Sequence, residues 1–387
     1  MPDQSPSTIT RLFKILLLIF LIYIFFLSIV MMGAGFKSFH QLSTNLITSV
    51  SNPIMGLLIG ILTTSIVQSS STTTSIVVGL VASNILGADS IRIAIPIIMG
   101  ANIGTTITNT LVSLGHISRT DEFKRAYSCA IVHDIFNIIA VAILLPLEIY
   151  FGLIEKISLK LGYFILHANI RGAEFKSPIG MITKPIVNFL YNSKYPGDGS
   201  PGFIQEIFSP TLAQIVILVI ALFLLFIALR FMVKVIRQLV IGKVEQFFSD
   251  YIFRNGILAL LLGLILTAIV QSSSITTSIM IPLAGAGIVN IYQVFPYTVG
   301  ANIGTTVTTL LAAMATCSPA ALVVAISHFT FNFLGMLIIL PLKPIRMIPI
   351  KIALAASNLT MKSKLYPILL IALIFFILPI FFLLITK

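Results

Sequence analysis

The chain has 387 residues, of which 57% are hydrophobic and only 9% are charged, and its mean hydropathy is +1.07. These values exclude an ordinary soluble protein, because apolar stretches of about twenty residues, the length that crosses a bilayer, recur along the chain. The net charge of +12 does not indicate a nucleic-acid-binding protein, since the cations lie between apolar segments, as they do in the cytoplasmic loops of membrane proteins. The two cysteines, Cys129 and Cys317, lie in or beside predicted spans, so neither a disulfide scaffold nor a CxxC metal site is expected.

The N-terminal segment combines a polar tail with a first apolar span. Residues 1–10 are polar, and we expect them to form a disordered cytoplasmic tail. Leu12–Met32 is the first span, and Arg11 and Lys14 place its start in the cytoplasm. A signal peptide is the alternative interpretation, but the segment is long for one and a similar span precedes the second half. On the far side, Phe36–Asn52 is a mixed stretch that is compatible with an amphipathic helix.

A polar octet, Gln68–Ser75, follows inside very apolar sequence, with the arms Ile54–Val67 before it and Ile76–Leu86 after it. An arm of about fourteen residues gives roughly 21 Å of helix, whereas the hydrocarbon core is about 30 Å thick. The pattern therefore predicts a re-entrant hairpin whose tip lies near the middle of the membrane, where irregular backbone must be buried in protein or face water. One tilted helix that is broken at the octet is the alternative.

The next apolar segment, Ile91–Leu114, is long enough to span, but the glycine-rich stretch Gly100–Thr106 lies near its middle. Two glycines and an asparagine in this stretch weaken a helix, so we predict a discontinuous span. The basic loop at His116–Arg125 is expected in the cytoplasm, and Ala126–Tyr150 is the next span. Residues 154–209 are expected to form a long polar extracytoplasmic loop.

The second half repeats this plan. Its predicted elements are, in order, a span at Thr211–Phe231, a hairpin at Asn255–Ile291 with the octet Gln271–Ser278 at its tip, a discontinuous span at Tyr292–Met314 and a span at Pro319–Leu340. Residues 343–364 are rich in Lys and Arg and lack acids, so we expect a cytoplasmic loop there, followed by a terminal transmembrane helix at residues 365–387.

The two halves form an internal repeat, which we assign to residues 11–153 and 210–342. Gly100–Thr106 is identical to Gly300–Thr306, and the Gln-Ser-Ser-Ser run, a His-x-x-Phe-Asn motif and a later proline also recur in the same order. An odd number of full crossings separates the first span from its copy, because a hairpin contributes none, so the second repeat is predicted to be inverted. We therefore predict an all-α integral membrane protein with two inverted-topology repeats, each with a re-entrant helical hairpin and a discontinuous transmembrane helix. Secondary transporters place substrate and ion sites at the interface of such repeats.

The two octets are the strongest candidates for a ligand site. Small residues that pack helix against helix are the alternative, but the duplication and the position inside hairpins favour binding. Hydroxyl and amide oxygens are hard ligands for a small alkali cation, while hydroxyl, amide and helix N-terminal N–H groups suit an oxyanion. No Lys or Arg lies between Asn255 and Leu342. We therefore expect the anion to be held without a fixed cation, with bound sodium supplying the positive charge.

The recurring glycine-rich stretch has two interpretations. Its glycines are either contacts where helices cross, or they unwind the helix so that backbone carbonyls and the Asn and Thr side chains coordinate sodium; we favour the second. The predicted sodium ligands from the octets and these stretches are Gln68, Gln271, Ser274, Thr276, Asn102, Thr105, Thr106, Asn302, Thr305 and Thr306. No transition metal is expected.

Other polar residues lie in the spans that follow. His133 and Asn137 are four residues apart on one helical face, as are His328 and Asn332, and we favour a buried polar pair that bonds helix to helix. Asp134 is a functional candidate because an ionisable residue in a span is costly. Its matching position is not acidic, so we do not place it in a symmetric core.

An intramembrane serine hydrolase is a remote alternative, built from the serines, the histidines and Asp134. The Gly-x-Ser-x-Gly elbow is absent from the sequence, and a symmetric duplication has no use in a catalytic triad. The sequence also lacks a P-loop and a metalloprotease motif, so we do not expect an enzyme.

These motifs resemble the type II sodium-dependent phosphate cotransporters. The resemblance rests on both Gln-Ser-Ser-Ser runs, both glycine-rich stretches, and the run from Arg119 through His133 and Asp134 to Glu148. It covers roughly residues 50–150 and 255–345. It implies that the hairpin tips bind phosphate, at Gln68, Ser69, Ser70, Ser71, Thr72, Gln271, Ser272, Ser273 and Ser274. The family's animal members carry cysteines in the large central loop, which this chain lacks, so regulation through such cysteines is not expected.

The resemblance and the repeat together predict a multi-pass cell-membrane symporter, with a cytoplasmic N-terminus, that imports inorganic phosphate with sodium by alternating access. Its expected partners are phosphate, sodium as the coupling ion and the lipid bilayer; no other cofactor and no nucleic acid are expected, and the oligomeric state stays open. A phosphate exporter, a carrier of another oxyanion, and a membrane-embedded interaction protein without cargo are the alternatives. Dependence of uptake on a sodium gradient would separate the transporters.

Overall fold

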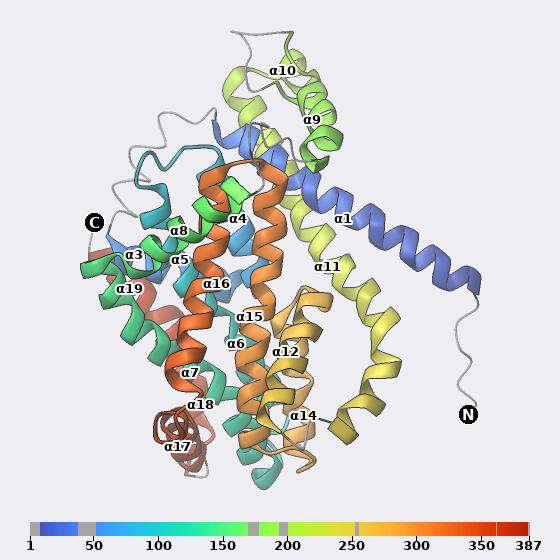
Figure 1. The fold of residues 1–387 in the computed structure, drawn as a ribbon. Helices are drawn as coiled ribbons and strands as arrows, with labels where there is room; N and C mark the ends of the chain where they lie inside the picture. Colours follow the sequence, from blue (N-terminus) through green and yellow to red (C-terminus); the bar gives the residue numbers. More distant parts are fainter. Residues whose placement is uncertain are drawn as a thin grey trace.

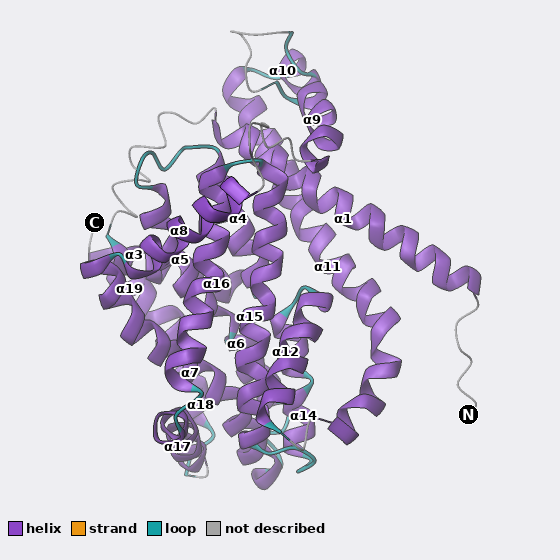
Figure 2. Ribbon diagram, in the orientation of Figure 1, coloured by secondary structure: helices purple, strands orange, loops and turns teal. Residues whose placement is uncertain are grey.

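The computed structural model describes residues 8–37, 52–168, 178–192, 200–251, 255–360 and 362–385. This described part is helical, with no strand in it (Figure 2). Most of the predicted polar tail at residues 1–10, and the amphipathic stretch at Phe36–Asn52 except its ends, lie outside the described residues. The predicted loop at residues 154–209 is described only in part, and its described part holds three helices, α8 (Leu153–Ala168), α9 (Pro178–Leu190) and α10 (Phe203–Ile207).

Seven helical segments of the described chain are long and apolar enough to cross a membrane, at the places predicted from the sequence. They are α1 (Thr8–Lys37), α5 with α6 (Ser90–Thr105, Ile107–Leu114), α7 (Thr120–Phe151), α11 (Pro210–Tyr251), α15 (Ile291–Thr316), α16 (Pro319–Ile339), and α18 with η1 and α19 (Leu365–Ile371, Ala372–Ile377, Leu378–Ile385). Another helix, α17 (Lys343–Thr360), fills most of the predicted basic loop and lies across the direction of the spans (Figure 1).

Each polar octet lies where two short helices meet. The first pair is α3 (Pro53–Val67) and α4 (Ser70–Ala82), and in the second pair α12 (Gly256–Val270) is followed by α13 (Ser273–Ser278) and α14 (Met280–Gly285). Asn52 and Asn255 are the N-caps of α3 and α12, the first arms of the two hairpins. Each asparagine side chain accepts a hydrogen bond from a backbone N–H of the first helical turn, at 2.9 and 3.0 Å. The predicted hairpins are therefore formed by helix–turn–helix pairs.

Threonine pairs bind the two arms of each hairpin together below the tip. Thr64 Oγ1 donates to Thr73 Oγ1 at 2.9 Å in the first hairpin. In the second, the hydroxyls of Thr267 and Thr276 lie 2.7 Å apart. All four threonines are buried, so these bonds satisfy hydroxyl groups that water cannot reach and fix how the arms cross.

The recurring glycines place each first arm directly against a span. A Cβ atom added at Gly100 would overlap the carbonyl oxygen of Leu57, and one added at Gly104 would lie 2.6 Å from the carbonyl oxygen of Ile61. The two helices α3 and α5 therefore run parallel with their backbones in contact, and α12 and α15 do the same around Gly300. Because α4 returns before α5 begins, the hairpin enters and leaves on the side where α5 starts, as a re-entrant hairpin does.

The structure corrects one detail of the predicted spans. The stretch Gly100–Thr106 was expected to break the helix, and in the first copy a break does fall within it, but after both glycines, at Thr106 between α5 and α6. In the second copy α15 runs without interruption through Gly300–Thr306. The physical reason is that the glycines serve the close packing against the hairpin arms, where a longer side chain does not fit, so their weak helix propensity is outweighed by tertiary contacts.

Candidate functional site

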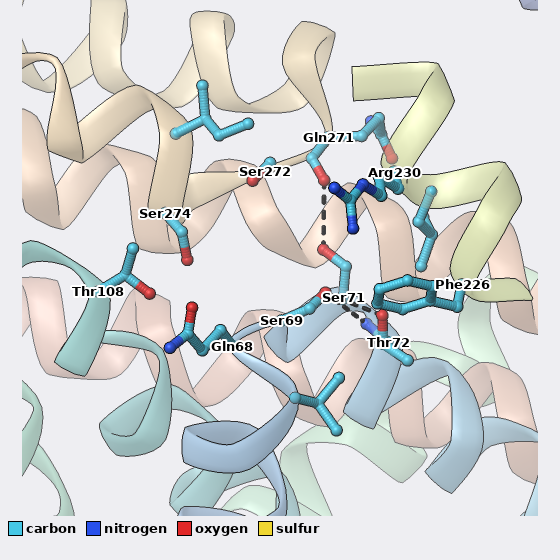
Figure 3. A pocket seen from close by; sticks show the side chains of 13 residues that line it. Gln68, Ser69, Ser71, Thr72, Thr108, Phe226, Arg230, Gln271, Ser272 and Ser274 are labelled. Atoms are coloured by element: carbon cyan, nitrogen blue, oxygen red, sulfur yellow. Dashed lines mark hydrogen bonds between the residues drawn. The ribbon is translucent and has the colours of Figure 1, made fainter. Parts of the chain in front are cut away.

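A cavity of about 290 Å³ lies between the two hairpin tips (Figure 3). At about 30 Å³ per water molecule, it has room for a small hydrated ion. The residues that line it come from both hairpins, from α6 and from α11, and they are Val67, Gln68, Ser69, Ser71, Thr72, Thr108, Phe226, Leu229, Arg230, Gln271, Ser272, Ser274 and Ile275. Two segments that are far apart in sequence thus meet at one polar site.

Both tips turn at a glutamine in the left-handed backbone region. Gln68 has φ 55° and ψ 30°, and Gln271 has φ 58° and ψ 25°. A side chain other than glycine costs about 1–2 kcal/mol in this conformation, so glycine would be the simpler choice for the turn alone. The chain accepts this cost at both tips, and both glutamine side chains line the cavity.

The hydroxyl groups of the first tip are held in fixed positions. Ser69 caps α4, because its Oγ accepts from the backbone N–H of Thr72 at 3.2 Å and from Thr72 Oγ1 at 2.9 Å. Ser71 Oγ donates to the backbone carbonyl of Gln271 at 3.3 Å, which connects the two tips across the cavity. In the second tip, Ser272 precedes α13 but makes no side-chain capping bond.

The predicted phosphate ligands fall into two groups. Those that line the cavity are Gln68, Ser69, Ser71, Thr72, Gln271, Ser272 and Ser274. Ser70 and Ser273 are buried in the first turns of α4 and α13 and do not line it. This split follows from helix geometry, because neighbouring positions on one turn point in directions about 100° apart and cannot all face one cavity.

The predicted sodium ligands in the glycine-rich stretches lie away from the cavity. The hydroxyls of Thr105 and Thr305 donate to the carbonyls of Ala101 and Ala301, at 2.8 and 3.0 Å. Thr106 and Thr306 behave likewise, each donating to the carbonyl three residues earlier at 2.7 Å. Thr276 faces Thr267 in the second hairpin rather than the cavity. The structure therefore does not bring all these residues to one centre.

The two recurring histidine–asparagine motifs bond the halves to one another. His133 Nε2 lies 2.6 Å from Asn302 Oδ1, and His328 Nε2 lies 3.3 Å from Asn102 Oδ1. Asn302 Nδ2 also donates to Asn137 Oδ1 at 2.7 Å. Each half thus offers a histidine to an asparagine of the other, which is the reciprocity expected of a two-fold relation. The interpretation of these motifs as residues that bond helix to helix is confirmed for His133, Asn137 and His328, whereas Asn332 donates to the carbonyl of His328 in its own helix, at 3.0 Å.

The same reciprocity extends to the hydroxyls of the hairpins. Thr277 Oγ1 donates to Asn109 Oδ1 at 2.9 Å, and Thr309 Oγ1 donates to Thr74 Oγ1 at 3.0 Å. The first pair joins the second hairpin to α6, and the second pair joins α15 to the first hairpin. Each hairpin is therefore anchored in the opposite half of the molecule.

Several buried oxygen atoms lack a hydrogen-bond partner among the described residues. They are Ser75 Oγ, Thr108 Oγ1, Asp134 Oδ1, Gln271 Oε1, Thr308 Oγ1 and Asn332 Oδ1. A buried polar atom without a partner costs about 1–3 kcal/mol, so such a set is rare unless a ligand or water completes it. All of these are hard oxygen donors of the kind that a sodium ion accepts. Asp134 is the acidic member, and Thr110 Oγ1 donates to its other carboxylate oxygen at 3.1 Å.

The expectation that the site lacks a fixed cation is wrong. Arg230 of α11 lines the cavity, and Figure 3 shows its side chain reaching toward the gap between Gln271 and Ser71. From the sequence alone, Arg230 indicates only that the end of the span Thr211–Phe231 faces the cytoplasm. The signal was present, however, because Arg230 lies within the apolar span Pro210–Met232, and an ionisable residue in a span is a candidate functional group.

Comparisons with known proteins identify one family across most of the chain. The sequence model of the family described as Na+/Pi-cotransporter matches residues 24–166 and 224–375. The chain is 32% identical to human sodium-dependent phosphate transport protein 2B over 95% of its own length and 64% of that protein. It is 31% identical to mouse sodium-dependent phosphate transport protein 2A, over 96% of the chain and 67% of the relative.

A third relative, sheep sodium-dependent phosphate transport protein 2A, is 34% identical over 85% of the chain and 60% of that protein. The chain thus spans less than two thirds of the length of the 2B relatives that it matches. No solved structure matches it. Both matched segments of the family model include a complete hairpin tip and the glycine-rich stretch that follows it.

Proposed function

Since the chain belongs to the Na+/Pi-cotransporter family, we propose that it is a multi-pass membrane transporter that carries inorganic phosphate together with sodium. One observation carries the proposal: both Gln-Ser-Ser-Ser tips, from opposite halves of the chain, line a single polar cavity. The relatives are named as sodium-dependent phosphate transporters, which supports the same substrate and coupling ion here. We further propose import across the cell membrane as the direction of net transport.

The cavity offers phosphate several donors. The amides of Gln68 and Gln271 and the hydroxyls of Ser69, Ser71 and Ser274 lie on its walls. Hydroxyls donate and also accept, so they bind an anion and complete the shell of a cation beside it. A doubly charged anion is costly to hold within a membrane unless positive charge accompanies it. Sodium bound next to the phosphate supplies part of that charge, which gives a physical reason for coupled transport.

For sodium, we propose sites that include the unpartnered buried oxygens. Gln271 Oε1 and Thr108 Oγ1 belong to residues on the cavity wall, so a sodium ion there would contact the same space as phosphate. Asp134 is the strongest further candidate because its carboxylate is buried and one of its oxygens is free of partners within the described structure. The glycine-rich residues Asn102, Thr105 and Thr106 and their copies Asn302, Thr305 and Thr306 remain candidate ligands.

The arrangement of the halves supports the predicted inversion. The end of the second hairpin, which leads into α15, lies beside the start of α7, the helix that follows α6: Arg125 of α7 donates two hydrogen bonds to the carbonyl of Gly285, at 3.0 and 2.7 Å. The start of α15 is therefore at the end of the molecule where α5 and α6 finish, so the two spans run in opposite directions. We propose that this relation provides alternating access, with one hairpin entering from each face.

The ends of the molecule differ as a cytoplasmic and an outer face would. In Figure 1, α14 and α17 lie at one end, and α9 and α10 lie at the other. The basic segments His116–Arg125 and Lys343–Lys364 belong to the first of these ends, and we assign it to the cytoplasm. We also propose a cytoplasmic N-terminus, because Arg11 and Lys14 lie at the start of the first span.

Uptake of labelled phosphate into vesicles that contain the purified protein tests the proposal. We expect uptake under an inward sodium gradient and little under an equal potassium gradient. Phosphate should also raise the apparent affinity for sodium by the same factor by which sodium raises the affinity for phosphate. Uptake that is equal in sodium and potassium would overturn sodium coupling, and preferential uptake of sulfate would assign the cavity to another oxyanion.

A further inference from the structure

We propose that Arg230 contacts the transported phosphate and is a fixed phosphate-binding cation outside the two duplicated tips. This inference rests on the proposed function and deepens it, because it adds to the site a residue that neither repeat motif contains. Arg230 lies on α11, the span that precedes the second hairpin, and it lines the same cavity as Gln68 and Gln271.

The position of the side chain supports direct contact. Figure 3 shows Arg230 on the wall opposite Thr108 and Ser274, with Phe226 beside it and Gln271 next to it. Its guanidinium therefore faces the space that the tips enclose, with hydroxyl groups on the other wall. A phosphate placed between these walls would meet the guanidinium on one side and serine and threonine hydroxyls on the other.

The charge on Arg230 is not neutralised within the described structure. Among the residues that line the cavity, Arg230 is the one with a charged side chain. The described ion pairs join His116 and Arg119 to Glu122, and none involves Arg230. An unpaired guanidinium next to a polar cavity attracts anions, and its planar fork matches two phosphate oxygens at once.

A span-end arginine whose head group simply reaches toward water is the alternative, since long basic side chains do this at the ends of membrane helices. Lys234, one helical turn further along α11, shows what that role looks like: it is exposed, as Arg230 is, but it lies 6.0 Å from the centre of the Phe231 ring and does not line the cavity. The two residues lie on the same helix, so Lys234 is a matched control for surface charge.

The inference changes the charge balance of the site. Without a fixed cation, sodium and the helix termini alone would have to offset a doubly charged phosphate. With Arg230 in contact, one positive charge is permanent, so phosphate should still bind weakly when sodium is absent. Arg230 also lies on only one side of the cavity, because no basic residue from the first half lines it.

The test compares three variants in vesicles loaded with the full-length protein, with inorganic phosphate as the substrate. Arg230→Gln should raise the KM for phosphate by about 10- to 100-fold, the effect of losing charge-assisted hydrogen bonds, while the maximal rate changes far less. Arg230→Lys should recover part of the affinity, since it keeps the charge but loses the fork. Lys234→Gln should leave the KM within about twofold of the unaltered protein.

Each outcome decides the question. A KM for Arg230→Gln that stays within about twofold of the unaltered protein, or an equal rise in Lys234→Gln, would overturn phosphate contact at Arg230. If Arg230→Gln fails to insert into the membrane, thermal unfolding replaces the uptake assay. Phosphate should then stabilise the unaltered protein against heat more than it stabilises Arg230→Lys. Equal stabilisation of the two proteins would also overturn phosphate contact at Arg230. Absence of sodium-driven uptake by the unaltered protein would instead overturn the proposed function, and this inference with it.

Discussion

The two halves of this chain carry the same polar motif, yet their hairpins have different neighbours. In the first half α1 packs against α4, and the side chain of Met32 reaches Gly79, where an added Cβ would lie 2.6 Å from its terminal methyl carbon. In the second half the corresponding helix, α11, bends away from α12 in Figure 1, and its residues Phe226 and Arg230 line the cavity. In the first half the preceding span packs on the returning arm of the hairpin, whereas in the second half the preceding span contributes residues to the cavity wall.

The hairpins themselves also differ. The returning arm of the first is one helix, α4, which is capped by Ser69. The returning arm of the second is divided at Ile279 into α13 and α14. Pro282 explains the division, because it has no N–H for the carbonyl of Ser278 and its ring crowds that carbonyl. The matching position in the first hairpin is Gly79, which keeps the helix intact.

In the proposed mechanism the duplicated residues bind phosphate and sodium, while residues outside the motif, such as Phe226 and Arg230, complete the cavity wall and add its charged side chain. A copied motif gives two tips with the same backbone turn. The cavity between them acquires a single arginine because the flanking spans have diverged. The predictions below either remove what the halves share or exchange what separates them.

Removing either glutamine should have the largest effect. Gln68→Gly and Gln271→Gly each keep the left-handed turn, which glycine adopts without strain, and each removes a carbonyl ligand and an amide donor. We expect sodium-driven phosphate uptake to fall by about 100-fold or more, as loss of contacts to two charged ligands implies. Thermal unfolding in detergent should be unchanged or shifted slightly upward, since about 1–2 kcal/mol of backbone strain is relieved.

The matched controls are Gln68→Asn and Gln271→Asn, because asparagine tolerates the left-handed region and keeps a shorter amide. They should retain more uptake than the glycine variants. Near-normal transport by Gln68→Gly would mean that only the second tip binds the ligands. The two glutamines would then differ in function although their backbone conformations are nearly the same.

A smaller effect is expected from replacing either of the two asparagines that join the halves, and the two replacements should lower the stability by different amounts. Asn302 bonds to both His133 and Asn137, whereas the side chain of Asn102 bonds only to His328 and its Nδ2 has no partner among the described residues. Asn302→Ala should therefore destabilise the protein by about 1–3 kcal/mol more than Asn102→Ala, because two buried partners lose their bonds instead of one. Melting temperatures in the same detergent measure the difference, and equal losses would show that the two networks carry equal weight.

Much of this architecture could be predicted from sequence because its signals are repeated and long. The seven spans follow from hydropathy, and the hairpins follow from arms that are too short to cross. The meeting of Gln68 and Gln271 followed from the repeat, because a two-fold relation brings matching positions together. These features depend on patterns that are periodic along the chain.

The missed features depend on packing between segments that are distant in sequence. The glycines of Gly100–Thr106 could not be assigned to close helix contact instead of helix breaking until Leu57 was seen against Gly100. Arg230 could not be assigned to the site, because sequence does not show which face of α11 lines the cavity. Of the predicted ligands, Ser70 and Ser273 face away because a helix can present only part of a polar run to one side.

The smallest effect should come from exchanging the residue that divides the second hairpin. Pro282→Ala restores an N–H for the carbonyl of Ser278 and allows α13 and α14 to join, as α4 does in the first half. Because the helix is already interrupted there, the gain in stability should be at most about 1 kcal/mol. Hydrogen exchange should slow at residues 278–283. If the divided arm moves during transport, the maximal rate should fall severalfold with the KM for phosphate unchanged, since Ser272 and Ser274 stay on the cavity wall.

Gly79→Ala is the matched control in the first hairpin, where the flexible end of Met32 can yield, and it should alter neither exchange nor rate. A normal rate for Pro282→Ala, with slowed exchange, would show that the division of the second arm is a difference of structure without a part in the transport cycle.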